Sequence, residues 1–311
     1  MPDREPLLSV ALCTRNRAAL LQRAIQSVVP QLGADAELLI VDNASTDDTP
    51  DAAQTAKAAH PEIRVLVETR PGLSFARNAA LREARGRFVI FLDDDAVAEP
   101  GWLDAYRKFF CTPPSARVAV AGGFVAPEYE TPPPRWLRAG LHTFDLGGAA
   151  RPINEHRGPW GCNIAYAREP ALRVGGFNPR LGRRGTSLGA HEEMDLNLRL
   201  EDAGFEVWWL PDARIRHRIT ADRMRLGWQL RSEFAQSRSR VTVKFQKRRR
   251  GERLLYGAGR VLIAPVACAI HLAVALVTSP VQHGRFAVQS LERAARAAGV
   301  AVEVLARAVS P

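Results

Sequence analysis

The sequence predicts an α/β fold: a mainly parallel sheet flanked by helices, with a helical extension at the C-terminal end. Two observations support this prediction. Short apolar runs alternate with segments of helical periodicity through the first half of the chain, as in sheets that helices cover on both faces. Basic and helix-forming sequence dominates after residue 220. We therefore expect a sheet domain at 1–220 and a basic helical region at 221–311.

Four strands and three helices are expected to alternate in the first half. The predicted strands are Leu7–Cys13, Glu37–Val41, Ile63–Val67 and Phe88–Leu92. The predicted helices are Ala18–Val29, a segment that ends at Ala59, and Ser74–Ala84. In the first helix, Leu21, Ala24 and Val28 recur at the spacing of one helical face. Ser45 or Thr46 has the side-chain oxygen that can cap the second helix.

The second half of the chain has weaker periodicity. Pro127–Pro159 is rich in proline and glycine, which predicts a long surface segment that could cover a substrate. A helix is expected at Ala190–Ala203 and a strand at Glu206–Leu210. Val261–Ser279 is almost wholly apolar, and Arg285–Val309 has the pattern of an Ala-rich amphipathic helix.

The charge of the chain favours a polyanionic partner. Its 311 residues carry a formal net charge of +10, with a pI near 10.2. Nucleic acid, an acidic membrane surface and a phosphorylated substrate are all consistent with this balance. The four cysteines form no CxxC pair, which argues against a zinc site or a disulfide scaffold and suits a reducing compartment. Because the N-terminus lacks a secretory-signal pattern, we expect a cytoplasmic location.

Three consecutive aspartates, Asp93, Asp94 and Asp95, directly follow the apolar run FVIFL. Like charges this close repel one another, which raises the pKa of each carboxyl unless a cation neutralises them. Carboxylate oxygens suit a hard divalent cation, Mn2+ or Mg2+, and such a cation can bind a diphosphate leaving group. A solvated acidic turn is the simpler alternative. The triplet should, however, face the polar strand ends Thr14–Arg17 and Asp42–Asn43, so we expect a cation site.

A second acidic cluster, His191-Glu192-Glu193-Met194-Asp195, opens the helix predicted at 190–203 and follows a glycine-rich stretch. Charge runs on helices are usually solvated faces, but a flexible loop that brings a carboxylate to a cleft is what a general base requires. Asp42 alone is either a turn residue or a hydrogen-bonding partner of a base or ribose. Arg77 is either an exposed helix residue or a cation beside the strand-end site.

Five segments follow one another in a specific order: SVALCTRNR, LLIVDNASTDDT, RPGLSFARNAALREARGRFVIFLDDDA, GCNIAYAREPALRVGGF and HEEMDLNLRLEDAGFEVWWLPDARIRH. Together they span residues 7–220, and the ordered set resembles an inverting family-2 glycosyltransferase with a GT-A (Rossmann-like) fold. The resemblance implies metal-dependent transfer of a sugar from a nucleoside-diphosphate sugar donor. The acceptor would be a hydroxyl of a glycan or of a lipid-linked molecule, as in polysaccharide biosynthesis.

The resemblance also implies roles for individual residues. Those that would bind the donor are Thr14, Asn16, Asp42, Arg77, Asp93, Asp94, Gly161, Cys162 and Asn163. Asp95 would be the principal metal ligand, with Asp93 and His217 beside it. Glu193 would be the general base, with Glu192 as the alternative because the family commonly has aspartate at this position, and Asp195 would support the helix or contact the acceptor. Trp160 either stacks on a sugar ring or packs in the core, and His217 has a structural alternative.

The C-terminal region leaves three alternatives open for Val261–Ser279: a buried helical hairpin, an interfacial anchor or a transmembrane helix. The basic cluster Lys247–Arg250 precedes it, as is typical beside an anionic membrane surface. We favour a peripheral position at the inner face of the cell membrane. Two other functions compete with the enzyme: a catalytically silent nucleotide-sugar-binding protein and a nucleic-acid-binding protein. No nucleic acid is expected, because the basic stretch lacks a recognition fold.

Overall fold

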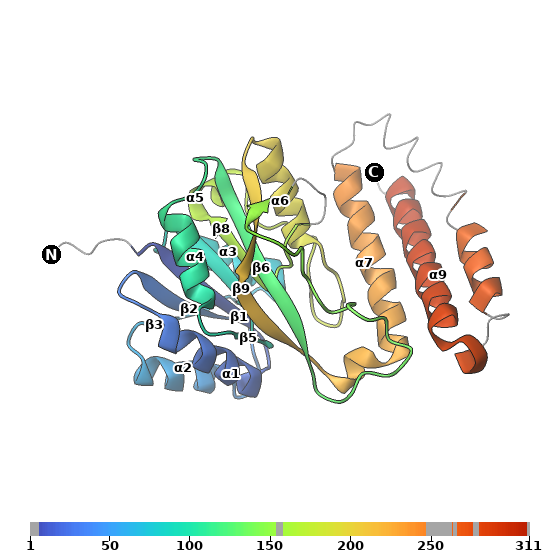
Figure 1. The fold of residues 1–311 in the computed structure, drawn as a ribbon, viewed down its shortest axis with the longest axis horizontal. Helices are drawn as coiled ribbons and strands as arrows, with labels where there is room; N and C mark the ends of the chain where they lie inside the picture. The colour runs from blue at the N-terminus through green and yellow to red at the C-terminus, as the bar shows by residue number, and fades with distance from the viewer. Residues whose placement is uncertain (1–5, 154–157, 247–262, 264–265, 276–279, 310–311) are drawn as a thin grey trace. The chain divides into compact units, whose positions relative to one another are not determined.

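The computed structural model describes residues 6–153, 158–246, 263, 266–275 and 280–309. The chain forms two compact units, which are coloured along the sequence in Figure 1. The unit that we call the sheet unit comprises Met1–Glu128, His142–Arg180 and Glu192–Arg218. The helical unit comprises Tyr129–Leu141, Leu181–His191 and Ile219–Pro311.

One sheet organises the sheet unit. Its strands are β1 (Leu8–Thr14), β2 (Ala36–Asp42), β3 (Ile63–Val67), β4 (Phe88–Asp93), β5 (Ala96–Ala98), β6 (Val118–Tyr129), β7 (Arg151–Pro152), β8 (Asn163–Ala167) and β9 (Glu206–Ile219). The spatial order is β3-β2-β1-β4-β8-β6-β9-β5, with β7 on β9. The first four strands pair in parallel, which confirms the predicted strands of the first half. β8 then pairs with β4 and β6 in antiparallel fashion, an arrangement that the periodicity did not predict.

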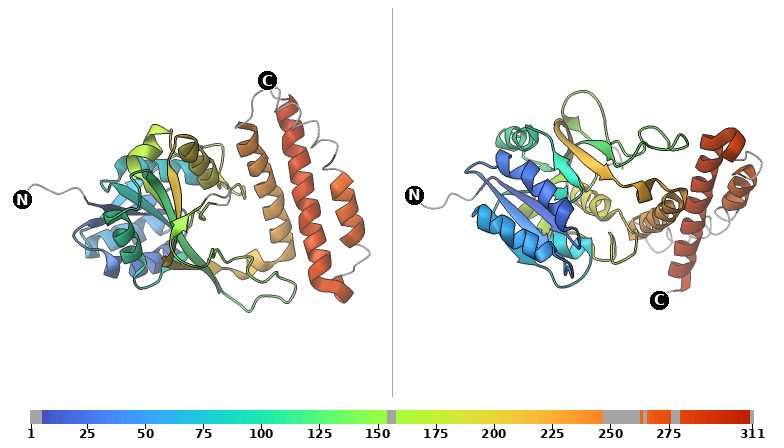
Figure 2. Two further views of the ribbon diagram at one scale, coloured as in Figure 1. Left: turned by 45° about the horizontal axis from the view of Figure 1, so that its top comes forward. Right: turned by 90° about the horizontal axis from the view of Figure 1, so that it is seen from below.

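Helices cover the sheet on both faces (Figure 2). They are α1 (Ala18–Val28), α2 (Thr49–Ala59), α3 (Leu73–Glu83), α4 (Trp102–Cys111), α5 (Arg168–Arg173) and α6 (Glu192–Asp202), and the short 3-10 turn η1 (Val29–Gln31) follows α1. α1 packs on α2, and α3 packs on α5. All seven residues of β2 are buried, and its central run Leu38–Val41 is apolar, as expected for a strand in a sheet covered on both faces.

The predicted cap of the second helix is wrong. α2 begins at Thr49, with Asp48 at the N-cap position and a proline in its first turn, and no side-chain hydrogen bond caps it. The hydroxyl of Ser45 instead accepts a hydrogen bond from the backbone N–H of Asn16 (3.0 Å). The backbone N–H of Thr46 donates to Oδ1 of Asn16 (2.8 Å). These two residues therefore join two loops at the strand ends and are not available to the helix.

The helical unit is built around two long helices, α7 (Leu226–Gln246) and α9 (Pro280–Val309), which pack against each other. The 3-10 turn η2 (Ala221–Met224) precedes α7. The helices approach closely at Gly299, where an added Cβ would lie 2.4 Å from the carbonyl oxygen of Phe234. The amphipathic helix predicted at 285–309 is confirmed, and it begins earlier, at Pro280.

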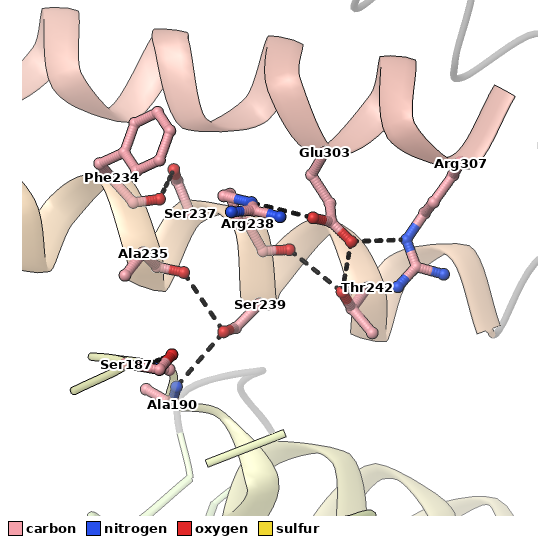
Figure 3. A network of polar contacts seen from close by, with 11 residues as sticks. Ser187, Ala190, Phe234, Ala235, Ser237, Arg238, Ser239, Thr242, Glu303 and Arg307 are labelled. Carbon is pink, nitrogen blue, oxygen red and sulfur yellow. Dashed lines mark hydrogen bonds and ion pairs between the residues drawn. The ribbon is translucent and has the colours of Figure 1, made fainter. Parts of the chain in front are cut away.

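A polar network centred on Glu303 joins the two helices (Figure 3). Its carboxylate accepts hydrogen bonds from Arg238 Nε (3.0 Å), from Thr242 Oγ1 (3.1 Å) and from Arg307 Nε (2.9 Å). Arg307 also donates to Thr242 Oγ1 at 2.8 Å. Because hydrogen bonds to charged groups are stronger than neutral ones, this network fixes the register of α7 on α9.

The remaining predictions for the second half have mixed outcomes. The segment Pro127–Pro159 is not wholly irregular, because β6 extends into it, β7 lies within it, and Val125 forms a bridge with Phe144. The basic cluster 247–250 and much of the apolar stretch 261–279 lie outside the described residues; within that stretch, 266–275 are helical. Among the helices that the structure describes, none is long and apolar enough to cross a bilayer.

Candidate functional site

The carboxyl ends of β1, β2 and β4 meet at one edge of the sheet, as predicted. Thr14 at the end of β1 lies opposite Asp42 of β2, and Cys13 lies opposite Asp93 of β4. The hydroxyl of Thr14 donates to Asp94 Oδ2 at 2.8 Å. Asp42 is buried, and its Oδ1 accepts a hydrogen bond from the backbone N–H of Ser45 at 3.3 Å. Side chains from three loops that are distant in sequence therefore share one site.

Asp93, Asp95 and His217 form a group that can hold a metal ion, since one ligand atom from each lies within 4.8 Å of the others. The pairing of β5 with β9 places Ala96 opposite His217, which brings the imidazole beside the aspartates. Its Nε2 lies 3.0 Å from Asp95 Oδ1. Two carboxylates and one imidazole suit a divalent cation such as Mn2+, which accepts both oxygen and nitrogen ligands. The chemistry of these ligands thus fits the predicted cofactor.

Asp94 is not part of this group of candidate ligands. Both of its carboxylate oxygens are engaged, one with Thr14 and the other with Arg17 NH1 at 2.8 Å. Burial raises the pKa of Asp94 to about 6; the charge of Arg17 lowers this pKa, and the neighbouring carboxylate of Asp95 raises it. Arg17 NH1 also lies 3.0 Å from Asp95 Oδ2. Sequence reasoning did not identify Arg17, although it belongs to the polar turn that follows the first strand.

Arg77 is almost completely buried, so the alternative of an exposed helix residue is wrong. Its NH1 donates to Glu192 Oε1 at 2.8 Å, and its NH2 donates to Asp93 Oδ1 at 3.0 Å. NH2 also donates to the carbonyl oxygen of Gly161 at 2.8 Å, and an added Cβ on Gly161 would lie 2.7 Å from Arg77 NH1. The guanidinium carbon lies 5.6 Å from the centroid of the Phe91 ring. Arg77 therefore joins the two acidic clusters that the sequence treated separately.

Glu192 and Glu193 stand in the first turn of α6 and have different environments. Glu192 is buried and paired with Arg77, while its Oε2 has no hydrogen-bond partner among the described residues. Burial raises the pKa of Glu193 to about 8, and the charge of Glu192 raises it further against the opposing effect of Arg77. Glu193 can thus exchange a proton near neutral pH, beside a carboxylate that is ion-paired with Arg77. Such a pair can serve acid–base chemistry.

Asp195 has a different environment, because its carboxylate is engaged within the helix. Its Oδ2 accepts hydrogen bonds from Arg199 Nε (2.9 Å) and NH2 (2.7 Å). Arg199 in turn donates to the carbonyl oxygens of Val174 and Gly176. This arrangement ties α6 to the end of α5, which agrees with the supporting role that was one of the two expectations for Asp195.

Asn163 is fully buried, and its amide is satisfied within the fold. Its Oδ1 accepts hydrogen bonds from Trp102 Nε1 (2.9 Å) and Tyr106 OH (2.8 Å). Its Nδ2 donates to the carbonyl oxygens of Phe124 (3.1 Å) and Ala213 (2.8 Å). All four hydrogen bonds that an amide side chain can make are therefore present. Asn163 therefore joins α4 to β6 and β9, and its side chain has no hydrogen-bonding capacity left for a donor sugar in this conformation.

The other predicted donor residues lie near the same edge. Trp160 is half-buried, and its ring centroid lies 5.5 Å from that of Phe144, so it packs in the core as one alternative proposed. Cys162 is buried. Asn16 is exposed and has a positive φ of 53°, and it joins the two strand-end loops through its contacts with Ser45 and Thr46.

Comparisons with known proteins identify the family and the fold of the chain. Residues 9–174 match the family model described as "Glycosyl transferase family 2". A glucosyl-dolichyl phosphate glucuronosyltransferase of Haloferax volcanii is 26% identical over 239 residues, which cover 75% of this chain and 76% of that protein. The succinoglycan biosynthesis protein ExoM of Rhizobium meliloti is 27% identical over 241 residues, covering 75% and 74% respectively. The mannosyltransferase PcManGT from Pyrobaculum calidifontis, solved with GDP-Man and Mn2+, shares the fold with a TM-score of 0.58 at 17% identity, over 100% of this chain and 77% of that one.

Proposed function

The chain belongs to glycosyl transferase family 2 and is a glycosyltransferase with the GT-A fold, and on this premise we propose a specific reaction. It transfers a sugar, with inversion, from a nucleoside-diphosphate sugar to a hydroxyl of a glycan or lipid-linked acceptor, and it requires a divalent cation. The observation that carries the proposal is the position of Arg77, which contacts the donor-side Asp93 and the acidic residue Glu192 at once.

On the donor side, Asp93, Asp95 and His217 would hold the cation. A divalent cation held there would offset the negative charge of a diphosphate leaving group. PcManGT, which shares the fold, was solved with GDP-Man and Mn2+, which supports a divalent cation and a nucleoside-diphosphate sugar as the bound molecules. Thr14 and Asp42, at the ends of neighbouring strands, are positioned to contact the nucleotide, and Asn16 holds the loop beside them.

On the acceptor side, we assign Glu193 as the general base. The acceptor hydroxyl gives its proton to the carboxylate of Glu193 while its oxygen attacks the anomeric carbon. The bond between the sugar and the diphosphate oxygen breaks on the opposite side, and that oxygen keeps the electron pair, which inverts the anomeric centre. A base whose pKa, at about 8, lies near the working pH suits this transfer.

Glutamine substitutions test the assignment of the base. Glu193→Gln should lower kcat by roughly 10²- to 10⁴-fold while leaving Mn2+ and nucleotide affinity close to wild type. Glu192→Gln serves as the matched variant, because it removes the neighbouring carboxylate and leaves the proposed base in place. Transfer at the wild-type rate in Glu193→Gln would place the base elsewhere.

The donor can be identified by ligand-dependent stabilisation. UDP, GDP and dTDP would each be added with Mn2+ in a thermal-shift measurement, and we expect one of them to raise Tm only when the cation is present. Asp95→Asn should remove most of this increase. Stabilisation without any sugar transfer would indicate the alternative of a silent nucleotide-sugar-binding protein.

We also propose that the helical unit binds an anionic membrane surface that presents a lipid-linked acceptor. Residues 219–311 contain 16 Lys and Arg but only 5 Asp and Glu, so they carry the positive excess of the chain. Val266, Ile270 and Leu272 are 58%, 56% and 44% exposed. The name of the Haloferax relative refers to a lipid phosphate, which supports an acceptor of this kind.

Vesicle sedimentation tests the membrane proposal. The protein should bind vesicles that contain phosphatidylglycerol more strongly than pure phosphatidylcholine, and added salt should weaken the interaction. Replacing Ile270 and Leu272 with serine should reduce binding at every salt concentration, because apolar contact contributes beside charge. The proposal would be contradicted if the same fraction of the protein sedimented with both kinds of vesicle.

A further inference from the structure

The carboxylates of Asp94 and Asp95 already have a cationic partner within the chain. A single nitrogen of Arg17, NH1, lies 2.8 Å from Asp94 Oδ1 and 3.0 Å from Asp95 Oδ2. The aspartate side chains are 7% and 6% exposed, whereas the Arg17 side chain is 34% exposed. The second oxygen of Asp95 faces His217 Nε2 at 3.0 Å. Asp95 is also a candidate ligand of the cation, so Arg17 contacts a carboxylate that the cation would bind.

The backbone of Arg17 is fixed more firmly than its side chain. Arg17 is the N-cap residue of α1, and its backbone N–H donates to Thr49 Oγ1 at 2.8 Å. Asn16 before it is joined to the loop at 45–46. The Arg17 side chain, in contrast, is 34% exposed, so water can solvate the guanidinium if it leaves the carboxylates. Because the backbone contacts of Arg17 do not involve the guanidinium, they can persist when it moves.

The guanidinium of Arg17 and a divalent cation would compete for the same carboxylate at this site. Two positive charges a few ångströms apart repel, and both draw on the same carboxylate of Asp95. Asp94 keeps its hydrogen bond from Thr14 if Arg17 moves, so displacement does not leave it without a partner. A diphosphate changes the balance, because its negative charge attracts the cation and the displaced guanidinium together.

We propose that Arg17 is the resident counter-cation of the Asp94–Asp95 pair and couples cation binding to diphosphate binding. Without ligands, Arg17 neutralises the pair and weakens the binding of a free divalent cation. With a diphosphate present, the cation binds more tightly than it does alone. This difference in affinity is the coupling free energy between the cation and the diphosphate. The inference rests on the proposed cation site and assigns Arg17 a positioning role.

The test compares Mn2+ affinity in wild type, Arg17→Gln, Arg17→Lys and the control Arg23→Gln. Arg23 lies on the same helix and pairs with Glu128 at 2.6 Å, so its loss changes the net charge equally at a different place. Free Mn2+ would be measured by electron paramagnetic resonance, with and without the nucleoside diphosphate that stabilises the wild type. The Kd for Mn2+ alone should fall at least about threefold in Arg17→Gln. It should stay near wild type in Arg17→Lys and Arg23→Gln.

The coupling itself supplies a second readout. In wild type, the nucleotide should tighten Mn2+ binding strongly, and in Arg17→Gln the ratio of the two Kd values should move toward one. In EDTA, Arg17→Gln should have a lower Tm than Arg23→Gln. Addition of Mn2+ without nucleotide should raise the Tm of Arg17→Gln by more than it raises the Tm of Arg23→Gln. The inference is overturned if the Kd for Mn2+ in Arg17→Gln equals or exceeds that of the wild type. It is also overturned if the nucleotide does not change the Kd for Mn2+ in the wild type.

Failure of the inference can be distinguished from failure of the proposed function. If wild type binds Mn2+, Asp95→Asn abolishes binding and Arg17→Gln changes nothing, only the role of Arg17 is wrong. If wild type binds no Mn2+ in any condition, the proposed cation site is wrong and the inference falls with it.

Discussion

Replacement of Arg77 by methionine tests whether the buried guanidinium holds the site together. Methionine keeps much of the side-chain volume between Phe91 and Phe177 but removes the charge and every donor. Glu192 would lose the partner at 2.8 Å, Asp93 the partner at 3.0 Å, and the Gly161 carbonyl its hydrogen bond. The perturbation is therefore an uncompensated charge in a buried position.

The magnitude follows from the exposure of the two carboxylates. Removing one partner of a buried ion pair costs about 3 to 5 kcal/mol. Asp93 is 33% exposed, so water compensates much of its loss, whereas Glu192 is 6% exposed and has no such compensation. We expect Arg77→Met to lower the free energy of unfolding by about 3 kcal/mol. Adding Glu192→Gln removes the orphaned charge, and the double-mutant cycle should show a coupling energy of about 2 kcal/mol.

Urea-induced unfolding in EDTA at pH 7, followed by tryptophan fluorescence, measures these free energies. Arg23→Met is the control, because Arg23 and Glu128 are 38% and 28% exposed and such a pair contributes at most about 1 kcal/mol. The reasoning would be refuted if Arg77→Met lowered the free energy of unfolding by no more than Arg23→Met does. It would also be refuted if the effects of Arg77→Met and Glu192→Gln were additive in the double mutant.

Three other outcomes are expected. The kcat/KM of transfer should rise with pH through about 8 as Glu193 loses its proton, and Glu192→Gln should move this rise to lower pH because a neighbouring negative charge is gone. Hydrogen bonds from Arg70 lower the pKa of Glu68 to about 2, so the stability from this group is complete above its ordinary pKa and disappears as pH falls through about 2. Glu68→Gln should accordingly cost about 1 kcal/mol in urea unfolding at pH 7 and nothing at pH 2, a small figure because Arg70 is 58% exposed. Gly299→Val should lower Tm, since the new side chain meets the backbone of α7, whereas Val302→Ala on the exposed surface of the same helix should leave Tm unchanged.

The parts of the fold that local sequence determines were predicted. β2 was found because Leu38–Val41 form a continuous apolar run, as is typical of a strand that is covered on both faces. Asp42 and Asp93 were placed at one edge because parallel strands with short connections end on the same side. The antiparallel pairing of β8 was not predicted, since an apolar strand pairs equally well in either direction.

Contacts between distant residues were beyond local patterns. Arg77 and Glu192 are separated by 115 positions, and nothing near Arg77 indicates that it is buried. Arg17 and Asp94 are separated by 77 positions, and the turn around Arg17 is as polar as any exposed loop. The resemblance supplied the aspartates, the glutamates and Arg77, but Arg17 and the ion pairs that connect these residues required the tertiary structure.

The charges at the strand ends give an argument for a divalent cation that is independent of any relative. Among the described residues, the ion pairs there join four carboxylates to two shared guanidinium groups, and these residues are Asp93, Asp94, Asp95, Glu192, Arg17 and Arg77. Each guanidinium is shared by two acids, so in these ion pairs the carboxylates outnumber the guanidinium groups. Buried like charges are costly without a counter-ion. A divalent cation would offset this excess of negative charge, and Asp93, Asp95 and His217 form a group that could hold one.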